Sequence, residues 1–471
     1  MPAVAAVVTT GIYCRPGCGA QPRPGNVRPF PLAAAAEAAG YRACLRCRPY
    51  RMSPSVAWAN PELVCRAVRL ILDGALDDRA EAQLGARLGV SARHLRRLFM
   101  THLGVTPDGL ARSARAHFAR RLLDDTDLTV TEIAFAAGFG SLRQFNRACL
   151  EVFRAPPREL RAKRRKADRL VADGGLLLRL PFNGPLDWDA MAAYFAARAI
   201  PGVEHVSGGT YRRTIVIGTN PGVLELYRGS GDHLLLLAHL PHWEHLIHVV
   251  DRARHIASLD FELAEPVSHL AQDPIMGSLL RGRPGLRPPG TWDPYETGVR
   301  AIIARRAGKA AANATMGRLV ERLGTPVPGL GSLGLSHTFP APETLATAEP
   351  GGLGLPDTIE GAVRVFAAAV AGGTVPLDRS VGLDQLITAL TGPGGLDHPT
   401  AHYLALRMNE PDAWPPTDDN WPTDDAWPTD DARLTGDAPR GVRERAGDLA
   451  ERWRPWRALA ATYLCVVDGR E

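Results

Sequence analysis

The sequence lacks the features that mark membrane-bound and secreted proteins. No apolar run reaches the roughly 20 residues that a membrane-spanning helix needs. The apolar start has no basic segment before it, so we expect no signal peptide. The seven cysteines are few and odd in number, which argues against a disulfide framework and favours a metal site in a reducing compartment. We therefore expect a cytoplasmic protein without a membrane partner.

Lysine is also scarce, and arginine supplies nearly all of the positive charge. The formal net charge is +5 at pH 7, which is compatible with a polyanionic partner but is common in proteins that bind none. Hydrophobic residues make up 45% and charged residues 22% of the chain, as in ordinary globular proteins. A chain of 471 residues exceeds one ordinary domain, and its length predicts about two to four.

Four of the cysteines form two close pairs near the start of the chain. Cys14 and Cys18 are separated by three residues, Cys44 and Cys47 by two, and 25 residues lie between the pairs. Four thiolates in this arrangement suit a closed tetrahedral site for one Zn²⁺, in which each short turn supplies two ligands. The ion would also supply folding energy that a segment of about 50 residues cannot obtain from burial alone.

Two later segments each predict a pair of helices joined by a tight turn. In the first, Gly89 forms the turn and Ser91 caps the second helix; in the second, Ala136–Gly138 form the turn and Ser141 is the cap. A bundle without a DNA-binding role is the alternative to two helix-turn-helix motifs. The residues expected to reach DNA are Arg93, His94, Arg96 and Arg97 in the first motif, and Ser141, Arg143, Gln144, Asn146 and Arg147 in the second, on the helix Leu142–Val152.

The pattern changes again from Leu176 onward. Short strand-like runs, such as LLLRLPF, YRRTIVIG and HLLLLAHL, alternate with helical segments, and from about Thr291 the chain again predicts helices. A proline-rich repeat of about six residues, from Trp414 to Ala432, predicts an expanded loop. The fold class is therefore multidomain and mainly α, with an α+β segment in the middle.

Three parts of the chain resemble known families. The segments TTGIYCRPGC and GYRACLRCRP resemble the zinc domain of Ada-type methylphosphotriester repair proteins. The paired helix-turn-helix motifs, with the signature GF-x-S-x-x-x-F-x-R, resemble the AraC-type DNA-binding domain. Three further segments resemble AlkA-type 3-methyladenine DNA glycosylases of the helix-hairpin-helix (HhH-GPD) superfamily: PLDWDAMAAYFAARAIPGVEHV, RPGLRPPGTWDPYETGVRAIIARR and AERWRPWRALAATYL. The resemblance implies a zinc-binding methyl-acceptor domain (1–52), a double helix-turn-helix domain (58–160), a basic linker (161–175), an α+β subdomain (176–288) and an all-α glycosylase domain (289–471).

This resemblance implies a DNA alkylation-damage protein that joins transcription control to base excision. Cys14, as the first motif cysteine, would take a methyl group from a DNA methylphosphotriester; a purely structural zinc site is the alternative. The glycosylase would flip an alkylated purine out of the duplex and hydrolyse its N-glycosidic bond without a cofactor. The expected partners are alkylated duplex DNA, promoter DNA and RNA polymerase, and the expected place of action is the nucleoid.

The resemblance also implies one catalytic aspartate after the hairpin of the glycosylase. Counting back from Trp453 places it at Asp431, with Asp430 as a close rival, whereas counting forward from PDAWPPTD places it at Asp418. Asp431 is favoured because Pro422 would interrupt a helix that Asp418 must lead. The alternative is that no aspartate of this loop is catalytic. No lysine follows Lys309, so a lyase reaction through a lysine nucleophile is not expected.

The hairpin, which is expected at residues 390–401 (LTGPGGLDHPTA), departs from the family pattern. Its tryptophan is missing, with His398 or Pro399 in its place, and Cys465 replaces a second pocket tryptophan. Aromatic rings hold a cationic base by stacking, so these losses motivate a second hypothesis: a DNA-binding transcriptional regulator whose glycosylase half is catalytically impaired and only reads damage. Tyr403 is expected either in the pocket or in the core. The predicted DNA-phosphate contacts of the hairpin are the amides of Gly392, Gly394 and Gly395.

Overall fold

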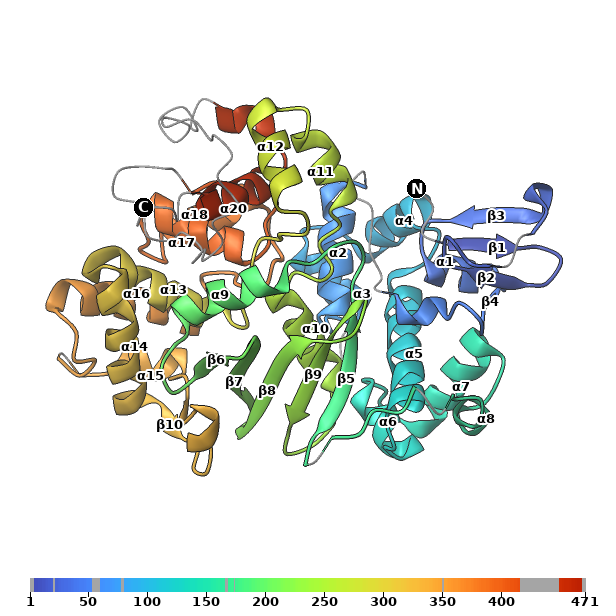
Figure 1. Ribbon diagram of the computed structural model, residues 1–471, viewed down its shortest axis with the longest axis horizontal. Helices are drawn as coiled ribbons and strands as arrows, with labels where there is room; N and C mark the ends of the chain where they lie inside the picture. The colour runs from blue at the N-terminus through green and yellow to red at the C-terminus, as the bar shows by residue number, and fades with distance from the viewer. Residues whose placement is uncertain are drawn as a thin grey trace. The chain divides into compact units, whose positions relative to one another are not determined.

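A computed structural model describes residues 4–19, 22–52, 60–77, 80–165, 168–172, 174–349, 351–415 and 449–467 (Figure 1). The chain divides into two compact units. Unit 1 comprises residues 1–183 and 229–254, and unit 2 comprises residues 184–228 and 255–471. Within the described ranges, no helix combines the length and the apolar character that crossing a membrane requires.

Unit 1 begins with a small four-stranded sheet, drawn in dark blue in Figure 1. The strand order is β3-β1-β2-β4; β1 is antiparallel to both of its neighbours, and β2 and β4 are parallel. One short helix, α1 (Ala33–Ala38), packs on the sheet through its buried alanines. The strands are β1 (Val4–Val7), β2 (Ile12–Cys14), β3 (Val27–Phe30) and β4 (Arg42–Ala43).

The middle of unit 1 is all helical and is organised around one long helix, α5. Thr106 caps this helix by accepting a hydrogen bond from the Gly109 amide at 3.1 Å, and Pro107 occupies its first turn. The helices α2, α4, α6, α7 and α8 all pack on α5. The bounds are α2 (Glu62–Leu72), α3 (Glu81–Arg87), α4 (Ala92–His102), α5 (Pro107–Asp125), α6 (Val130–Ala136), α7 (Leu142–Phe153) and α8 (Pro157–Ala162).

Both predicted helix-turn-helix motifs are present in these helices. Gly89 and Gly138 adopt positive φ angles of 71° and 78° in the turns α3–α4 and α6–α7, a conformation that side chains with a Cβ rarely adopt. The Ser91 hydroxyl accepts from the His94 amide at 3.2 Å, and the Ser141 hydroxyl accepts from the Gln144 amide at 3.3 Å. The predicted turns and caps are therefore confirmed, and α7 extends one residue beyond its predicted end.

Unit 1 ends with a pair of antiparallel strands and the start of a helix. The strands β5 (Leu176–Pro181) and β9 (His233–His239) pair with Leu178 opposite Leu236, and alternate leucines are buried along both. This alternation is the pattern that predicted both strands from the sequence. The helix α10 (Leu246–Ile256) follows β9 and runs through the boundary of the unit at Arg254.

Unit 2 opens with a helix and an antiparallel meander. Helix α9 is held to the turn between the first two strands by a hydrogen bond of 2.8 Å from the Trp188 indole nitrogen to the Gly209 carbonyl. The strand predicted from YRRTIVIG is confirmed as part of β7, whose two partners were not predicted. The bounds are α9 (Trp188–Arg198), β6 (Glu204–Ser207), β7 (Thr210–Ile217) and β8 (Asn220–Arg228).

The rest of unit 2 is a helical core around α13, as the sequence predicts. Helices α14, α16 and α18 pack on α13, and Gly298 lies where α16 packs against it. A Cβ at Gly298 would lie 2.4 Å from a ring carbon of Phe366 in α16, so only glycine fits there. The elements are α11 (Ala264–Leu270), α12 (Pro274–Gly282), α13 (Pro294–Ala307), α14 (Lys309–Leu323), β10 (Thr325–Pro326), β11 (His337–Thr338), α15 (Pro342–Thr347), α16 (Asp357–Ala371), α17 (Leu383–Thr391), α18 (His398–Arg407) and α20 (Arg457–Val467).

Candidate functional site

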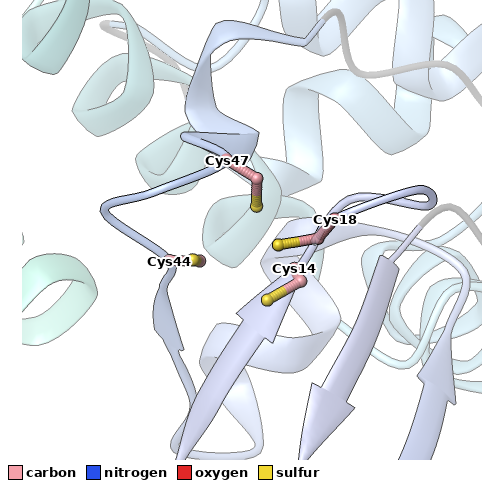
Figure 2. A group of neighbouring side chains, drawn as sticks. All are labelled: Cys14, Cys18, Cys44 and Cys47. Atoms are coloured by element: carbon pink, nitrogen blue, oxygen red, sulfur yellow. The ribbon is translucent and has the colours of Figure 1, made fainter. Parts of the chain in front are cut away.

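The four cysteines of the two predicted pairs meet at one edge of the small sheet in unit 1. Cys14 ends β2, and a turn through Gly17 (φ 74°) returns the chain to Cys18. Cys44 follows β4, and a second turn leads to Cys47. The four Sγ atoms lie within 4.8 Å of one another and point toward a common centre (Figure 2). The sequence therefore identified this cluster correctly.

The donor set and its environment fit a zinc ion. Cys14 and Cys44 are 8% and 9% exposed, and Cys18 and Cys47 are partly exposed. Burial raises the pKa of the Cys14 thiol far above its usual range, with further increases from Cys47 and Cys44, and burial raises the pKa of Cys47 to about 11. Four thiolates this close need a cation between them, and sulfur ligands in a tetrahedral set are those of structural Zn²⁺ sites. The six cysteines in the described part are free thiols.

A hydrogen-bonded group ties the residue before Cys14 to helix α5. The Tyr13 hydroxyl donates to Glu37 at 2.5 Å, and the Ser113 hydroxyl and the His117 ring lie 2.6 Å from the same carboxylate. Tyr13 is fully buried. Tyr13, which directly precedes the cluster residue Cys14, is therefore linked through Glu37 to α5, the central helix of the DNA-binding fold. The sequence did not indicate this connection.

A second junction joins the end of the zinc segment to the same helix. Arg51 lies 2.8 Å from Asp125, and Arg48 lies 2.6 Å from Asp168. The fully buried Tyr50 donates to Asp124 at 3.0 Å. Because buried charges are costly unless they are paired, this network fixes the zinc segment to the end of α5 in one arrangement.

The residues predicted to reach DNA lie on α4 and α7, the second helix of each motif. Arg93, Arg96 and Arg97 are exposed on α4, where Arg96 pairs with Glu81 of α3 and Arg97 lies 2.9 Å from the His94 ring. Because the three arginine side chains are exposed, their guanidinium groups can exchange these partners for phosphates or base edges. His94 is partly exposed.

The α7 helix presents a similar face. Arg143, Gln144 and Arg147 are exposed, and Arg147 pairs with Glu151 at 2.8 Å. Asn146 is partly exposed and donates to the Leu142 carbonyl at 2.8 Å. Gln144 and Asn146 both have the amide side chain suited to reading adenine in the major groove, and of the two Gln144 is the exposed one.

The hairpin of the glycosylase half joins α17 to α18. The amides of Gly392, Gly394 and Gly395 donate to backbone carbonyls at 2.9, 2.9 and 3.2 Å. Asp397 caps α18 by accepting from the Thr400 amide at 2.8 Å, and Arg305 lies 3.3 Å from the same carboxylate. A phosphate bound by these glycine amides would have to replace internal hydrogen bonds, so their role in DNA binding stays a prediction.

A small cavity of about 50 Å³ lies in unit 2, where α9 and β7 meet α13 and α18. Tyr403 of α18 lines it, and its hydroxyl lies 3.1 Å from that of Tyr194 on α9. Trp292, in the loop before α13, is a further ring of the wall. The sequence left Tyr403 open between the pocket and the core and did not single out the other two rings.

Charged side chains make up much of the same cavity wall. Arg213 is 2% exposed and makes two hydrogen bonds to Glu296, at 2.9 and 2.8 Å. Burial raises the pKa of Glu296 to about 7, and the adjacent guanidinium opposes this change. The guanidinium groups of Arg198 and Arg407 lie 3.8 and 4.7 Å from the ring centre of Tyr194. A flat cationic ligand on Tyr194 would therefore compete with two resident cations.

The three candidate catalytic aspartates, Asp431, Asp430 and Asp418, lie outside the described residues, as does the side chain of Cys465. At the hairpin position without tryptophan, where His398 or Pro399 stands, the ring of His398 lies 4.6 Å from that of His402. Burial, reinforced by His398, lowers the pKa of His402 to about 4, so this ring is neutral at pH 7. Its Nδ1 accepts from the Trp414 amide at 3.3 Å, next to Pro415, the last described residue before the aspartate-rich repeat.

Three family models match successive parts of the chain. They are described as the metal binding domain of Ada (residues 2–50), a helix-turn-helix domain (residues 84–163) and the AlkA N-terminal domain (residues 177–293). These matches agree with the three resemblances found in the sequence.

Individual proteins extend the likeness over the whole chain. The probable bifunctional transcriptional activator/DNA repair enzyme AlkA of Mycobacterium tuberculosis is 35% identical over 466 residues, covering 98% of this chain and 92% of that protein. DNA-3-methyladenine glycosylase 2 of Escherichia coli is 29% identical over 294 residues, covering 62% of this chain and 97% of that protein. The structure of a 3-methyladenine DNA-glycosylase from Archaeoglobus fulgidus covers 62% of this chain and 97% of its own, with 19% identity and a TM-score of 0.49. The four-cysteine cluster, the paired helix-turn-helix motifs and this full-length identity together show that the chain belongs to the family of bifunctional transcriptional activator/DNA repair enzymes that includes AlkA.

Proposed function

We propose that the chain is a DNA alkylation-damage response protein. It is a sequence-specific DNA-binding regulator fused to a monofunctional DNA-3-methyladenine glycosylase, with the five segments predicted from the sequence as its domains. The observation that carries the enzymatic part is the aromatic cavity between α9 and α18, in the half of the chain that is similar to E. coli DNA-3-methyladenine glycosylase 2. A flipped purine binds between aromatic rings, and Tyr194 and Tyr403 supply such rings in one wall.

The size of the cavity limits how a base enters. At about 50 Å³ it holds a few water molecules, whereas pockets that bury a drug-sized ligand are on the order of 300–1,000 Å³. A purine can therefore enter only if the wall opens, and the arginines on Tyr194 are the groups that must move. Alkylated purines are already cationic and leave readily, so the protein mainly has to position water and stabilise the developing positive charge on the sugar.

We assign that stabilising role to Asp431, with Asp430 and Asp418 as rivals. The test is release of 3-methyladenine from alkylated duplex DNA under single-turnover conditions. Asp431→Asn is expected to slow release by a factor on the order of 10²–10³, the usual cost of losing one electrostatic stabiliser. Asp232→Asn is the matched control, because its side chain is 81% exposed. Release that Asp431→Asn, Asp430→Asn and Asp418→Asn all leave unchanged would show the assignment to be wrong.

A damage reader without turnover is the second candidate function. Two observations favour it: the hairpin glycine amides are already hydrogen-bonded, and the negatively charged Asp397 stands at the start of α18, where a phosphate would have to bind. Tight binding of alkylated DNA by the wild-type chain without base release would support this candidate. Any turnover that depends on a loop aspartate would exclude it.

For the four-cysteine site we propose methyl transfer to Cys14. A bound zinc ion keeps the thiolates deprotonated at neutral pH. The Cys14 sulfur attacks the methyl carbon of a DNA methylphosphotriester; the S–C bond forms, the C–O bond breaks, and a phosphodiester anion leaves. Intact-mass measurement and peptide mapping should find one added methyl group on Cys14. Cys14→Ser should abolish it, Cys65→Ser should not, and a methyl group found on Cys18 or Cys47 would contradict the assignment.

For α4 and α7 we propose recognition of promoter DNA, with RNA polymerase as a further partner and the nucleoid as the place of action. Gln144→Ala should cost about 1–3 kcal/mol of binding and relax base preference at one position. Arg143→Ala should weaken binding to all sequences and reduce its salt dependence. Arg158→Ala is the control, because this exposed residue lies on α8, outside both motifs. Equal losses for all three variants would contradict the proposal.

A further inference from the structure

Three metal-ligating side chains meet in unit 1 away from the cysteine cluster. Asp77 follows α2, and His245 and His248 stand at the start of α10, nearly 170 residues later in the chain. One ligand atom from each, two imidazole nitrogens and a carboxylate oxygen, lies within 4.8 Å of the others. His248 Nε2 is hydrogen-bonded to Asp77 Oδ2, and His245 Nδ1 lies 3.8 Å from the same oxygen.

The surroundings of the three residues are shaped to admit them. Gly74, with φ 96°, leaves the space that the His248 ring fills, since a Cβ there would lie 2.5 Å from His248 Cε1. Gly138, the turn glycine of the second helix-turn-helix, would carry its Cβ 3.6 Å from Asp77 Oδ2. Two glycines with left-handed backbone conformations thus line this junction between α10 and the helical part of unit 1.

His245 is held in a conformation that is uncommon for a residue with a side chain. Its φ angle is 57°, and its amide donates to the Phe135 carbonyl at 3.1 Å. Left-handed residues other than glycine are rare and cluster at functional sites, because the surrounding structure must compensate their strain. This turn places the His245 ring beside that of His248, with ring centres 5.8 Å apart and an angle of 20° between the planes.

One further residue fixes the orientation of the carboxylate. Arg115 of α5 binds Asp77 Oδ1 at 2.5 Å, which leaves Oδ2 facing the two histidines. Such an outer partner, bonded to the oxygen that does not bind the metal, is typical of carboxylate ligands. The side chains of Asp77, His248 and His245 are 12%, 24% and 55% exposed, so an ion can enter from the side of His245.

We propose that Asp77, His245 and His248 form a second metal site, which takes a divalent transition ion such as Zn²⁺. Two imidazoles and one carboxylate are ligands that suit zinc, iron, cobalt and nickel, whereas calcium and magnesium prefer oxygen alone. Three protein ligands leave a coordination position for water on the exposed side. A bound ion would hold the start of α10 to the turn that follows α2.

The test uses the full-length chain with its cysteine site loaded with zinc. After equilibration with excess Zn²⁺ and removal of free metal, elemental analysis should find two zinc ions per chain in the wild type and one in His245→Ala and His248→Ala. His242→Ala is the matched control: this histidine stands in the same segment, pairs with Glu244 and is outside the cluster, so two ions should remain. One ion in the wild type, or two in both cluster variants, would overturn the proposal.

Two further measurements separate loss of a ligand from loss of the fold. Co²⁺ added to the wild-type chain that holds zinc only in its cysteine site should give the weak visible bands of a nitrogen and oxygen site without a thiolate charge-transfer band, and His245→Ala should lack them. The exposed His245 leaves the Asp77–His248 pair intact when it is replaced. Addition of Zn²⁺ should slow amide exchange in α10 of the wild type and of His242→Ala, but not of His245→Ala. Equal slowing in His245→Ala would refute the site.

Discussion

Glu296 and Arg213 offer the sharpest test of the energetics of the glycosylase half. Both are buried, the pair is held by two hydrogen bonds, and Arg213 is 2% exposed. Glu296→Ala leaves the guanidinium without its main partner, and breaking a buried pair in this way costs about 3–5 kcal/mol. Arg213 keeps a contact with Glu204 at 3.3 Å and with the Trp292 ring, so we expect a loss of about 3 kcal/mol.

A loss of this size raises the equilibrium constant for local opening roughly 10²-fold. Hydrogen exchange of peptides from β7 and α13 measures that constant without assuming that the whole chain unfolds in two states. Glu225→Ala is the control: it removes a cross-strand pair with Arg212 on the same meander, and such pairs contribute only about 0.2–1 kcal/mol.

A double substitution distinguishes two causes of the lost stability: the missing ion-pair attraction, and the cost of burying the Arg213 charge without its main partner. Arg213→Met combined with Glu296→Leu removes both charges and should recover most of the stability that Glu296→Ala loses. Exchange rates for Glu296→Ala within a factor of about five of the wild type, less than roughly 1 kcal/mol, would refute the reasoning. A double variant as unstable as the single variant would show that the pair is important for its shape rather than for its charge.

Three further outcomes follow from the structure. Burial lowers the pKa of His402 from 6.5 to about 4, so the unfolded chain takes up this proton first, and unit 2 should lose stability as the pH falls from about 6.5 toward 4. His402→Gln should flatten this dependence in urea titrations, and an unchanged slope would contradict it. Ser141→Ala removes the cap of α7 and should cost about 1 kcal/mol, measured by hydrogen exchange of that helix, with Ser268→Ala, outside any cap, as control. Chelation of zinc should expose residues 4–52 to proteolysis before residues 60–165; simultaneous cleavage of both would contradict a separately stabilised zinc segment.

The sequence predicted those features whose signals are local. The cysteine spacing identified the zinc ligands because each pair needs only one short turn, and the geometry agrees. Ser91, Gly138 and Ser141 were identified for the same reason, since caps and left-handed turns depend on a few adjacent residues.

Features that depend on distant parts of the chain were not predicted. Strand β8 starts with Asn-Pro-Gly, residues that are depleted in strands, and forms because β7 lies beside it. The pairs Arg213–Glu296 and Glu37–His117 are 83 and 80 residues apart, and nothing in their neighbouring residues indicates the partner. The catalytic aspartate was left open among three candidates because the repeat offers nearly the same surroundings at several positions.

The carboxylate of Glu37 has a consequence for how the parts of unit 1 influence one another. It accepts a hydrogen bond from Tyr13 of the strand that ends in Cys14, and it contacts Ser113 and His117 of α5, so one side chain joins this strand to the helix. Helix α5 in turn contacts α4 and α7, the second helices of both motifs. A displacement of β2 therefore either breaks the Tyr13–Glu37 hydrogen bond or moves Glu37, whose other two partners lie on α5, the helix that packs on α4 and α7. If Cys14 accepts a methyl group as proposed, a change at one sulfur atom would be passed through α5 to both proposed DNA-binding helices at once.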